Sequence, residues 1–134
     1  MKEILDYTYQ DTWQRRQGRL ETLGMNYEEY LMSQHWQDIR NKALKRKNYQ
    51  KCECCSEVNN LHLHHSSYKW LGDSKNELRT LNSFCDHHHK YIHELAKRYN
   101  ISVRLATNYL RDPQSKITKD SILAYGNELT KELY

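Results

Sequence analysis

Residues 85–93 read Cys-Asp-His-His-His-Lys-Tyr-Ile-His, so that four of the 8 histidines in the chain fall in this short stretch. Seven of the 8 lie between positions 62 and 93, and the four cysteines, at positions 52, 54, 55 and 85, occupy nearly the same window. Such crowding of nitrogen and sulfur ligands is typical of metal sites. His35 lies outside the window and is expected to be an ordinary surface histidine.

The low apolar content of the chain suggests that a metal site would stabilise its fold. Only 37% of the 134 residues are hydrophobic, the mean hydropathy is −1.06, and there is one Phe against 11 Tyr. A small domain with so little to bury often needs a metal or disulfide staple. The chain has no apolar run of about 20 residues and no signal-like start. We therefore expect no membrane span and one intracellular domain over 1–134, in which reduced cysteines bind metal.

The formal charge of +4 is unevenly distributed. Residues 40–51 carry six cations and no acidic residue. Cations clustered in this way favour a polyanionic partner such as DNA, because they displace condensed counterions from its phosphates. The alternative is a solvated helix face. The residues expected to follow a DNA backbone are Arg40, Lys42, Lys45, Arg46 and Lys47.

Residue patterns predict a mostly helical chain with one small β element. The segment 58–65 has an Asn pair followed by alternation, which indicates a hairpin strand. Gly24 and Asn26 indicate a turn, and Ser33 is a candidate N-cap. Helices are predicted over 2–22, 34–47, 86–99, 102–111 and 119–133, with Pro113 separating the last two.

Two ligand pairs have the spacing of a zinc site. Cys52 and Cys55 form a Cys-x₂-Cys knuckle, and Cys85 and His88 supply a second pair after 29 intervening residues. We predict a structural zinc ion bound by these four residues. Cys54 offers an alternative chelate with Cys52, but two residues between ligands is the more usual spacing, so Cys54 is expected to be a spectator.

The remaining histidines suggest a second metal site. If residues 86–94 are helical, His89 and His93 lie above one another on one face, and His88 points about 140° away. One helix then offers ligand pairs to two separate sites, with His87 facing away from both. His89 and His93 need a third ligand, for which the strand offers His62, His64 or His65. Alternation sends His62 and His64 to one face of the strand and His65 to the other.

Three segments together, residues 30–55, 61–72 and 81–93, resemble an HNH endonuclease. The resemblance covers 27–95 and is strongest for the small bacterial and phage type, which carries a zinc knuckle around a ββα-metal core. His88 stands where the family usually has a fourth cysteine. The resemblance implies an α+β fold with this core over 27–95, a helical extension over 1–26 and C-terminal helices over 96–134. It also implies a cytoplasmic location, in a bacterial cell or a phage-infected host.

The family pattern implies a role for each histidine. His65, the second residue of the His64-His65 pair, matches the general base that deprotonates the attacking water. His64, His89 and His93 match the ligands of one catalytic divalent ion, which is Mg²⁺, Mn²⁺, Ni²⁺ or Zn²⁺. The implied activity is hydrolysis of DNA phosphodiester bonds to 5′-phosphate and 3′-hydroxyl ends.

The residue that gives the family the letter N of its name is different in this chain. The family has Asn nine positions before the first metal-binding histidine of the helix, which helps to hold the base; here this position is Thr80. Asn76 is the alternative if the loop over 72–80 folds back. The rival function is a zinc-stabilised DNA-binding module without catalysis, but the retained histidines favour the nuclease. The sequence leaves monomer and homodimer open.

Overall fold

The computed structural model describes residues 7–111, and the predicted helix over 119–133 lies outside this range. The described residues are mostly helical with one two-stranded antiparallel sheet, which confirms the α+β prediction. None of their helices is long and apolar enough to cross a bilayer. In chain order the elements are α1 Tyr9–Leu23, α2 Tyr27–Met32, α3 Gln34–Leu44, η1 Lys47–Tyr49, β1 Leu61–His65, η2 Glu77–Thr80, β2 Leu81–Cys85, α4 Asp86–Tyr99 and α5 Val103–Arg111.

Local capping signals determine the boundaries in the N-terminal half. Gly24 ends α1 in the left-handed region, with φ of 69°, and the Asn26 side chain accepts from the backbone N–H of the third residue of α2. The Ser33 hydroxyl accepts from Trp36 N at 3.2 Å and caps α3. The predicted turn and the predicted cap are therefore confirmed. The short helix α2 was not predicted, because its six residues show too little periodicity.

The hairpin pairs β1 with β2 in a register that runs from Leu61 opposite Cys85 to His65 opposite Leu81. The predicted strand is present as β1, but its burial does not alternate, because His64 and His65 are both buried. The five residues of β2 are all buried, so the strand lacks the alternation by which a half-buried strand is detected. The chain enters α4 directly after Cys85, and the helix therefore starts at the open end of the hairpin.

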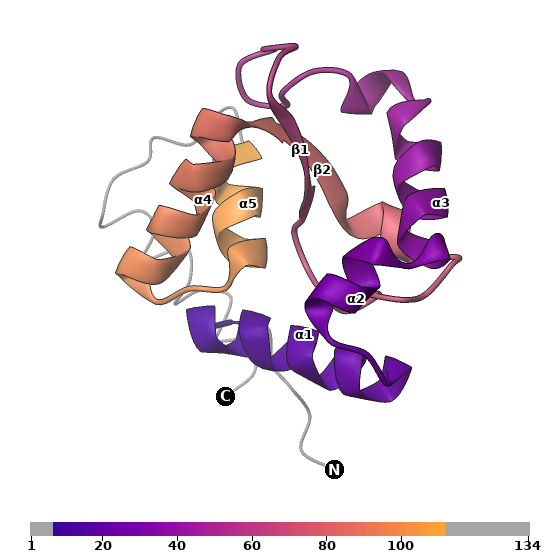
Figure 1. Ribbon diagram of the computed structural model, residues 1–134. Coiled ribbons are helices and arrows are strands. Elements are labelled where there is room, and N and C mark those ends of the chain that lie inside the picture. The colour runs from indigo at the N-terminus through magenta and orange to yellow at the C-terminus, as the bar shows by residue number, and fades with distance from the viewer. Residues whose placement is uncertain (1–6, 112–134) are drawn as a thin grey trace.

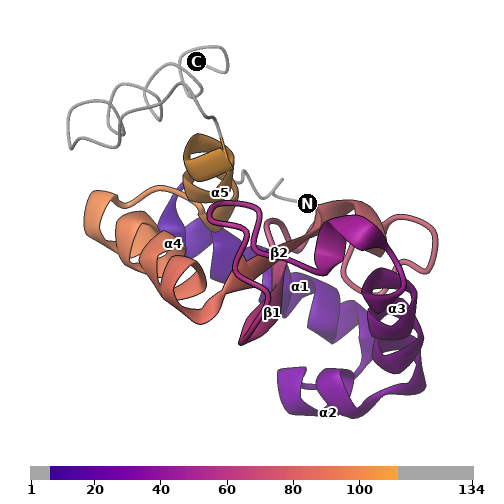
Figure 2. The same cartoon turned by 90° about the horizontal axis from the view of Figure 1, so that it is seen from above.

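The hairpin separates two apolar clusters. Figure 1 shows α4 and α5 on one side of it and α3 on the other, while α1 runs from the α4–α5 side toward α2. Figure 2 shows the same division from above. Phe84 belongs to the cluster with α4 and α5, and Leu81 belongs to the cluster with α1, α2 and α3. Trp13 packs against both clusters, so α1 joins the two halves.

Candidate metal centres

The first metal-ligand cluster joins the cysteine knuckle to the start of α4. The ligand atoms of Cys52, Cys55, Cys85 and His88 all lie within 4.8 Å of one another. The Cys55 and Cys85 sulfurs are 3.8 Å apart, and Cys52 Sγ is 3.7 Å from His88 Nδ1. A tetrahedral zinc ion with Zn–S distances of about 2.3 Å needs sulfur atoms about 3.8 Å apart. The structure therefore brings the predicted ligands together in a geometry compatible with structural zinc.

The thiols of this region differ in how readily they ionise. Burial alone would raise the pKa of Cys52, but backbone N–H groups of Cys54, Cys55 and Cys85 outweigh it and lower the pKa. Burial and the neighbouring Cys52 raise the pKa of Cys54 to about 12. The thiolate is the form that binds metal. Cys54 lies outside the cluster, in agreement with its predicted spectator role.

The second cluster consists of three histidines and is called the three-histidine cluster below. His64 from β1 meets His89 and His93 from α4, again with ligand atoms within 4.8 Å of one another. His89 Nε2 and His93 Nε2 are 3.3 Å apart. Nitrogen ligands about 2.1 Å from one ion in a tetrahedral arrangement are about 3.4 Å apart. Of the three strand histidines, the structure brings His64 to this cluster.

The surroundings of the three-histidine cluster favour neutral imidazoles. Burial lowers the pKa of His64 well below its usual range, and the neighbouring His89 and His93 add to the effect. Burial, followed by the charge of His93, lowers the pKa of His89 to about 4. Burial also lowers the pKa of His93. The cluster therefore presents lone pairs at neutral pH, which is the form that binds a cation.

Thr107 on α5 determines which nitrogen His64 offers. The Thr107 hydroxyl donates its proton to the Val103 carbonyl at 2.7 Å, and His64 Nε2 lies 2.9 Å from the same hydroxyl oxygen. Since the single hydroxyl proton is already donated, His64 Nε2 must be the donor. Nδ1 of His64 is then the nitrogen with a free lone pair. Thr107 therefore orients a candidate metal ligand in the way that outer hydrogen-bond partners commonly do.

His65 faces away from the three-histidine cluster, as alternation predicts, and binds a buried carboxylate. Its Nε2 lies 2.9 Å from Glu77 Oε2, and the Tyr30 hydroxyl donates to the same oxygen. The other oxygen accepts from His35 Nε2 at 2.8 Å and from Gly72 N at 2.7 Å. Glu77 is 0% exposed and His65 is 5% exposed. We call these five residues the Glu77 network.

Four donors keep Glu77 ionised despite its burial. Burial raises its pKa, but the hydrogen bonds from His65, Tyr30, His35 and Gly72 together outweigh burial and lower the pKa to about 2. An ionised carboxylate can only accept hydrogen bonds, so His65 donates through Nε2. Nδ1 is therefore the nitrogen of His65 that can take up a proton. His35 is half-buried in this network, so the expectation of an ordinary surface histidine was wrong.

The two residues predicted to support His65 have other partners. The Thr80 hydroxyl donates to the Glu77 carbonyl at 2.9 Å, and the Asn76 amide donates to the Asp73 carboxylate at 3.1 Å. The side chain that hydrogen-bonds His65 is instead that of Glu77. No sequence signal distinguishes Glu77, because its side-chain partners lie 12, 42 and 47 positions away.

His62 is the exposed histidine beside the three-histidine cluster. Its Nε2 lies 3.1 Å from Asp86 Oδ1, and its ring stacks on that of His89 with centroids 4.9 Å apart. It is not a member of the cluster. His62 is therefore open to solvent next to a candidate metal ligand, whereas His65 is buried.

The predicted DNA-tracking residues lie on another part of the surface. They belong to α3 or to the segment that follows it, and Figure 1 shows α3 across the hairpin from α4. Their solvated positions agree with both interpretations of the basic segment. The exposed residues are Arg40, Lys42, Lys45, Arg46 and Lys47.

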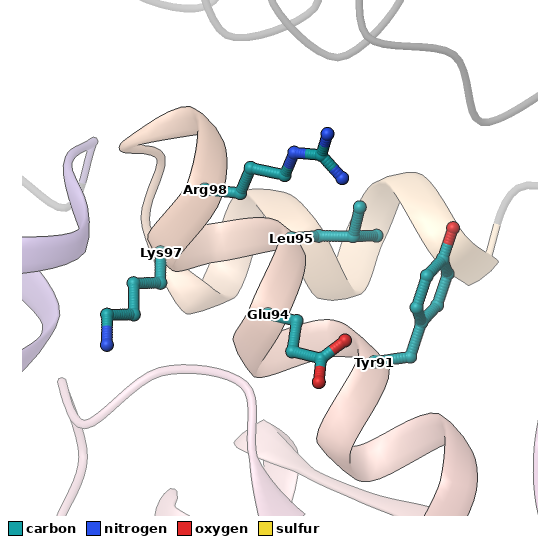
Figure 3. Close-up of a pocket in the computed structure, with 5 residues that line it drawn as sticks. All are labelled: Tyr91, Glu94, Leu95, Lys97 and Arg98. Carbon is teal, nitrogen blue, oxygen red and sulfur yellow. The ribbon is translucent and has the colours of Figure 1, made fainter.

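α4 also borders a surface hollow of about 500 Å³, shown in Figure 3. Helical geometry places this face opposite His89 and His93. The hollow contains no member of either ligand cluster. Its lining residues are Tyr91, Glu94, Leu95, Lys97 and Arg98.

Comparison of the chain with known proteins found no matching protein family, no matching curated protein and no matching solved structure. A function therefore has to be inferred from the ligand clusters and the residues around them.

Proposed function

We propose that this protein is a metal-dependent DNA endonuclease of the HNH type, which hydrolyses phosphodiester bonds to 5′-phosphate and 3′-hydroxyl ends. The observation that carries the proposal is the three-histidine cluster between a β-hairpin and the helix that follows it. The same helix holds the second half of a Cys₃His cluster. Three protein ligands leave coordination positions open for substrate, whereas four close a structural site.

The two clusters suit different ions. Cys52, Cys55, Cys85 and His88 fit a structural zinc ion. Three neutral imidazoles fit Zn²⁺ or Ni²⁺ best, and Mn²⁺ and Mg²⁺, which prefer oxygen ligands, are further candidates in keeping with the family resemblance. An ion at the three-histidine cluster would supply Lewis-acid stabilisation of the phosphate and of the leaving 3′ oxygen.

The chain itself would handle the proton of the attacking water. His65 is the proposed proton acceptor, through Nδ1, because Glu77 occupies Nε2. Glu77 holds the imidazole in one tautomer and one orientation, as an acidic partner does for other catalytic histidines. Since His65 is buried, this role requires that water reaches Nδ1 in the complex with DNA, where catalytic hydrogen bonds commonly tighten.

The burial of His65 also favours a second candidate function. If water does not reach His65, the protein is a zinc-stabilised DNA-binding module, in which the Glu77 network serves only to join the hairpin to α2 and α3. Alternatively, the exposed His62 accepts the proton, since it contacts His89 directly. Variants of the two histidines separate these possibilities.

The test is cleavage of supercoiled plasmid by purified protein across a panel of Mg²⁺, Mn²⁺, Ni²⁺ and Zn²⁺. We expect wild type to cut and His65→Ala to lose about 10²–10⁴-fold in rate. His89→Ala should lose activity that extra metal partly restores. His87→Ala is the matched control, because His87 lies on the same helix, is exposed and belongs to neither cluster.

Each other result has a defined meaning. A wild type that binds DNA but cuts with none of the ions is the binding module. If the His65→Ala variant still cuts DNA and the His62→Ala variant does not, His62 is the proton acceptor.

A further inference from the structure

We propose that Arg16 on α1 binds a DNA phosphate adjacent to the one at the three-histidine cluster. This inference rests on the proposed nuclease function and names a contact of the same site. It concerns binding of the phosphodiester backbone and assigns no step of the chemistry to Arg16.

Arg16 is held by aromatic rings from three parts of the chain. Its guanidinium carbon lies 4.8 Å from the Trp13 ring centre, 4.3 Å from that of Tyr27 and 5.8 Å from that of Tyr68. Trp13 is on α1, Tyr27 begins α2, and Tyr68 follows β1. The Arg16 guanidinium also hydrogen-bonds the Tyr68 side chain. Contacts with ring faces hold the guanidinium plane and leave its other N–H donors for a ligand.

This aromatic cradle adjoins the three-histidine cluster. The Trp13 ring stacks on the ring of His93, with centroids 6.0 Å apart and planes inclined by 13°. Trp13 thus contacts both Arg16 and a proposed metal ligand. Successive phosphates of a DNA strand follow one another every 3.4 Å or so along the helix axis. On this proposal, a strand with one phosphate at the cluster presents a neighbouring phosphate to Arg16.

The charge of Arg16 has no acidic counterpart within residues 7–111. Two other cations of this part of the chain form ion pairs, Lys90 with Asp86 at 3.0 Å and Arg111 with Glu53 at 3.4 Å. Arg16 is half-buried, and a partly desolvated cation normally has an anionic partner. A guanidinium matches a phosphate with two parallel N–H donors. These observations point to a phosphodiester as the missing anion.

The rival interpretation is that Arg16 only joins α1 to α2 and to the loop after β1. The two interpretations differ in the salt dependence of DNA binding. We would measure binding of a short fluorescein-labelled duplex at several NaCl concentrations, without added divalent cation. Loss of one phosphate contact makes the negative slope of log K against log salt less steep by about 0.9. Loss of a purely structural residue leaves the slope unchanged.

Three variants make the comparison. We expect Arg16→Gln to make the slope less steep by about 0.9. Arg16→Lys should retain the wild-type slope, because lysine keeps the charge. Arg98→Gln is the matched control, since it removes the same charge from the face of α4 opposite His89 and His93. In cleavage assays Arg16→Gln should raise KM and leave kcat unchanged, as expected for a contact made equally in the ground and transition states.

A measurement on the wild type covers the case in which Arg16→Gln does not fold. The Nε–H resonance of Arg16 should shift when the duplex is added, and that of Arg98 should not. The Arg16 proposal fails alone if the wild type cuts DNA but the Arg16 resonance does not shift when the duplex is added. It also fails alone if the wild type cuts DNA and a folded Arg16→Gln variant has the same salt slope as wild type. If the wild type neither binds nor cuts DNA, this proposal and the nuclease function fail together.

Discussion

Glu77→Gln should remove a defined, acid-sensitive part of the stability of the fold. The Glu77 network lowers the pKa of this carboxyl from 4.5 to about 2. At about 1.4 kcal/mol per pH unit, this difference corresponds to about 3 kcal/mol. Glutamine has the shape of the protonated acid but cannot ionise. The variant should therefore be less stable than wild type by about 3 kcal/mol at neutral pH.

The sign of the pH dependence follows from the direction of the pKa. Because the pKa of Glu77 is lower in the folded chain than in the unfolded chain, its stabilisation is complete above about pH 4.5. It is lost as the pH falls toward about 2, where the folded carboxyl is protonated as well. The difference between wild type and Glu77→Gln should therefore narrow across this window.

The three-histidine cluster titrates in a separate window. The pKa of His89 falls from 6.5 to about 4 on folding, so the fold disfavours its charged form. Stability is consequently lost as the pH falls from about 6.5 to about 4. Wild type and Glu77→Gln share this loss, and it cancels in their difference.

The assay is urea unfolding, followed by tryptophan fluorescence, at a series of pH values from 7 down to the acid transition. Glu94→Gln on the exposed face of α4 is the matched control and should behave as wild type. A difference between wild type and Glu77→Gln that is absent at pH 7, or that stays constant below pH 4.5, would refute the reasoning. Either result would mean that the network does not stabilise the ionised carboxylate.

Two further predictions concern the metal centres. Thr107→Val should weaken binding of Mn²⁺ or Zn²⁺ at the three-histidine cluster by about 10–100-fold in calorimetric titrations, because His64 loses the partner that orients it, while Thr107→Ser should retain the affinity. Cys52→Ser should lower both the zinc content found by elemental analysis and the thermal midpoint, whereas Cys54→Ser should change neither, since only Cys52 belongs to the Cys₃His cluster. Normal zinc content in Cys52→Ser would contradict the ligand assignment.

The grouping of the candidate metal ligands could be predicted because short-range geometry places most of them. Cys85 and His88 are one helical turn apart, as are His89 and His93, so spacing alone separates the two pairs on α4. Spacing could not select one ligand from the three histidines of the strand in the same way. Alternation left His62 and His64 equivalent, and only the family resemblance preferred His64.

Residues that act through distant partners could not be predicted. Thr107 reaches His64 across 43 positions, and Glu77 reaches Tyr30 across 47, so their roles depend on how α5 and α2 dock against the hairpin. A threonine in a helix and an acid at the start of a short 3-10 helix are ordinary residues when considered singly. The same limit applies to β2, whose complete burial removed the alternation that would have revealed it.

The division of α4 between two ligand clusters restricts how this chain can change length over evolution. One residue inserted between His88 and His89 would turn His89 and His93 by about 100° relative to the Cys₃His cluster. No adjustment of the hairpin could restore both sets of ligands, because the hairpin leads directly into the helix at Cys85. Val58 and Asn59 are exposed and precede β1. They lie between Glu57, whose carbonyl accepts from Cys52 N at 2.7 Å, and Asn60, whose carbonyl accepts from Asp86 N at 3.0 Å. Insertions between Val58 and Asn59 therefore leave both clusters in register, and lineages of this protein should gain residues there and keep a fixed interval from Cys85 to His93.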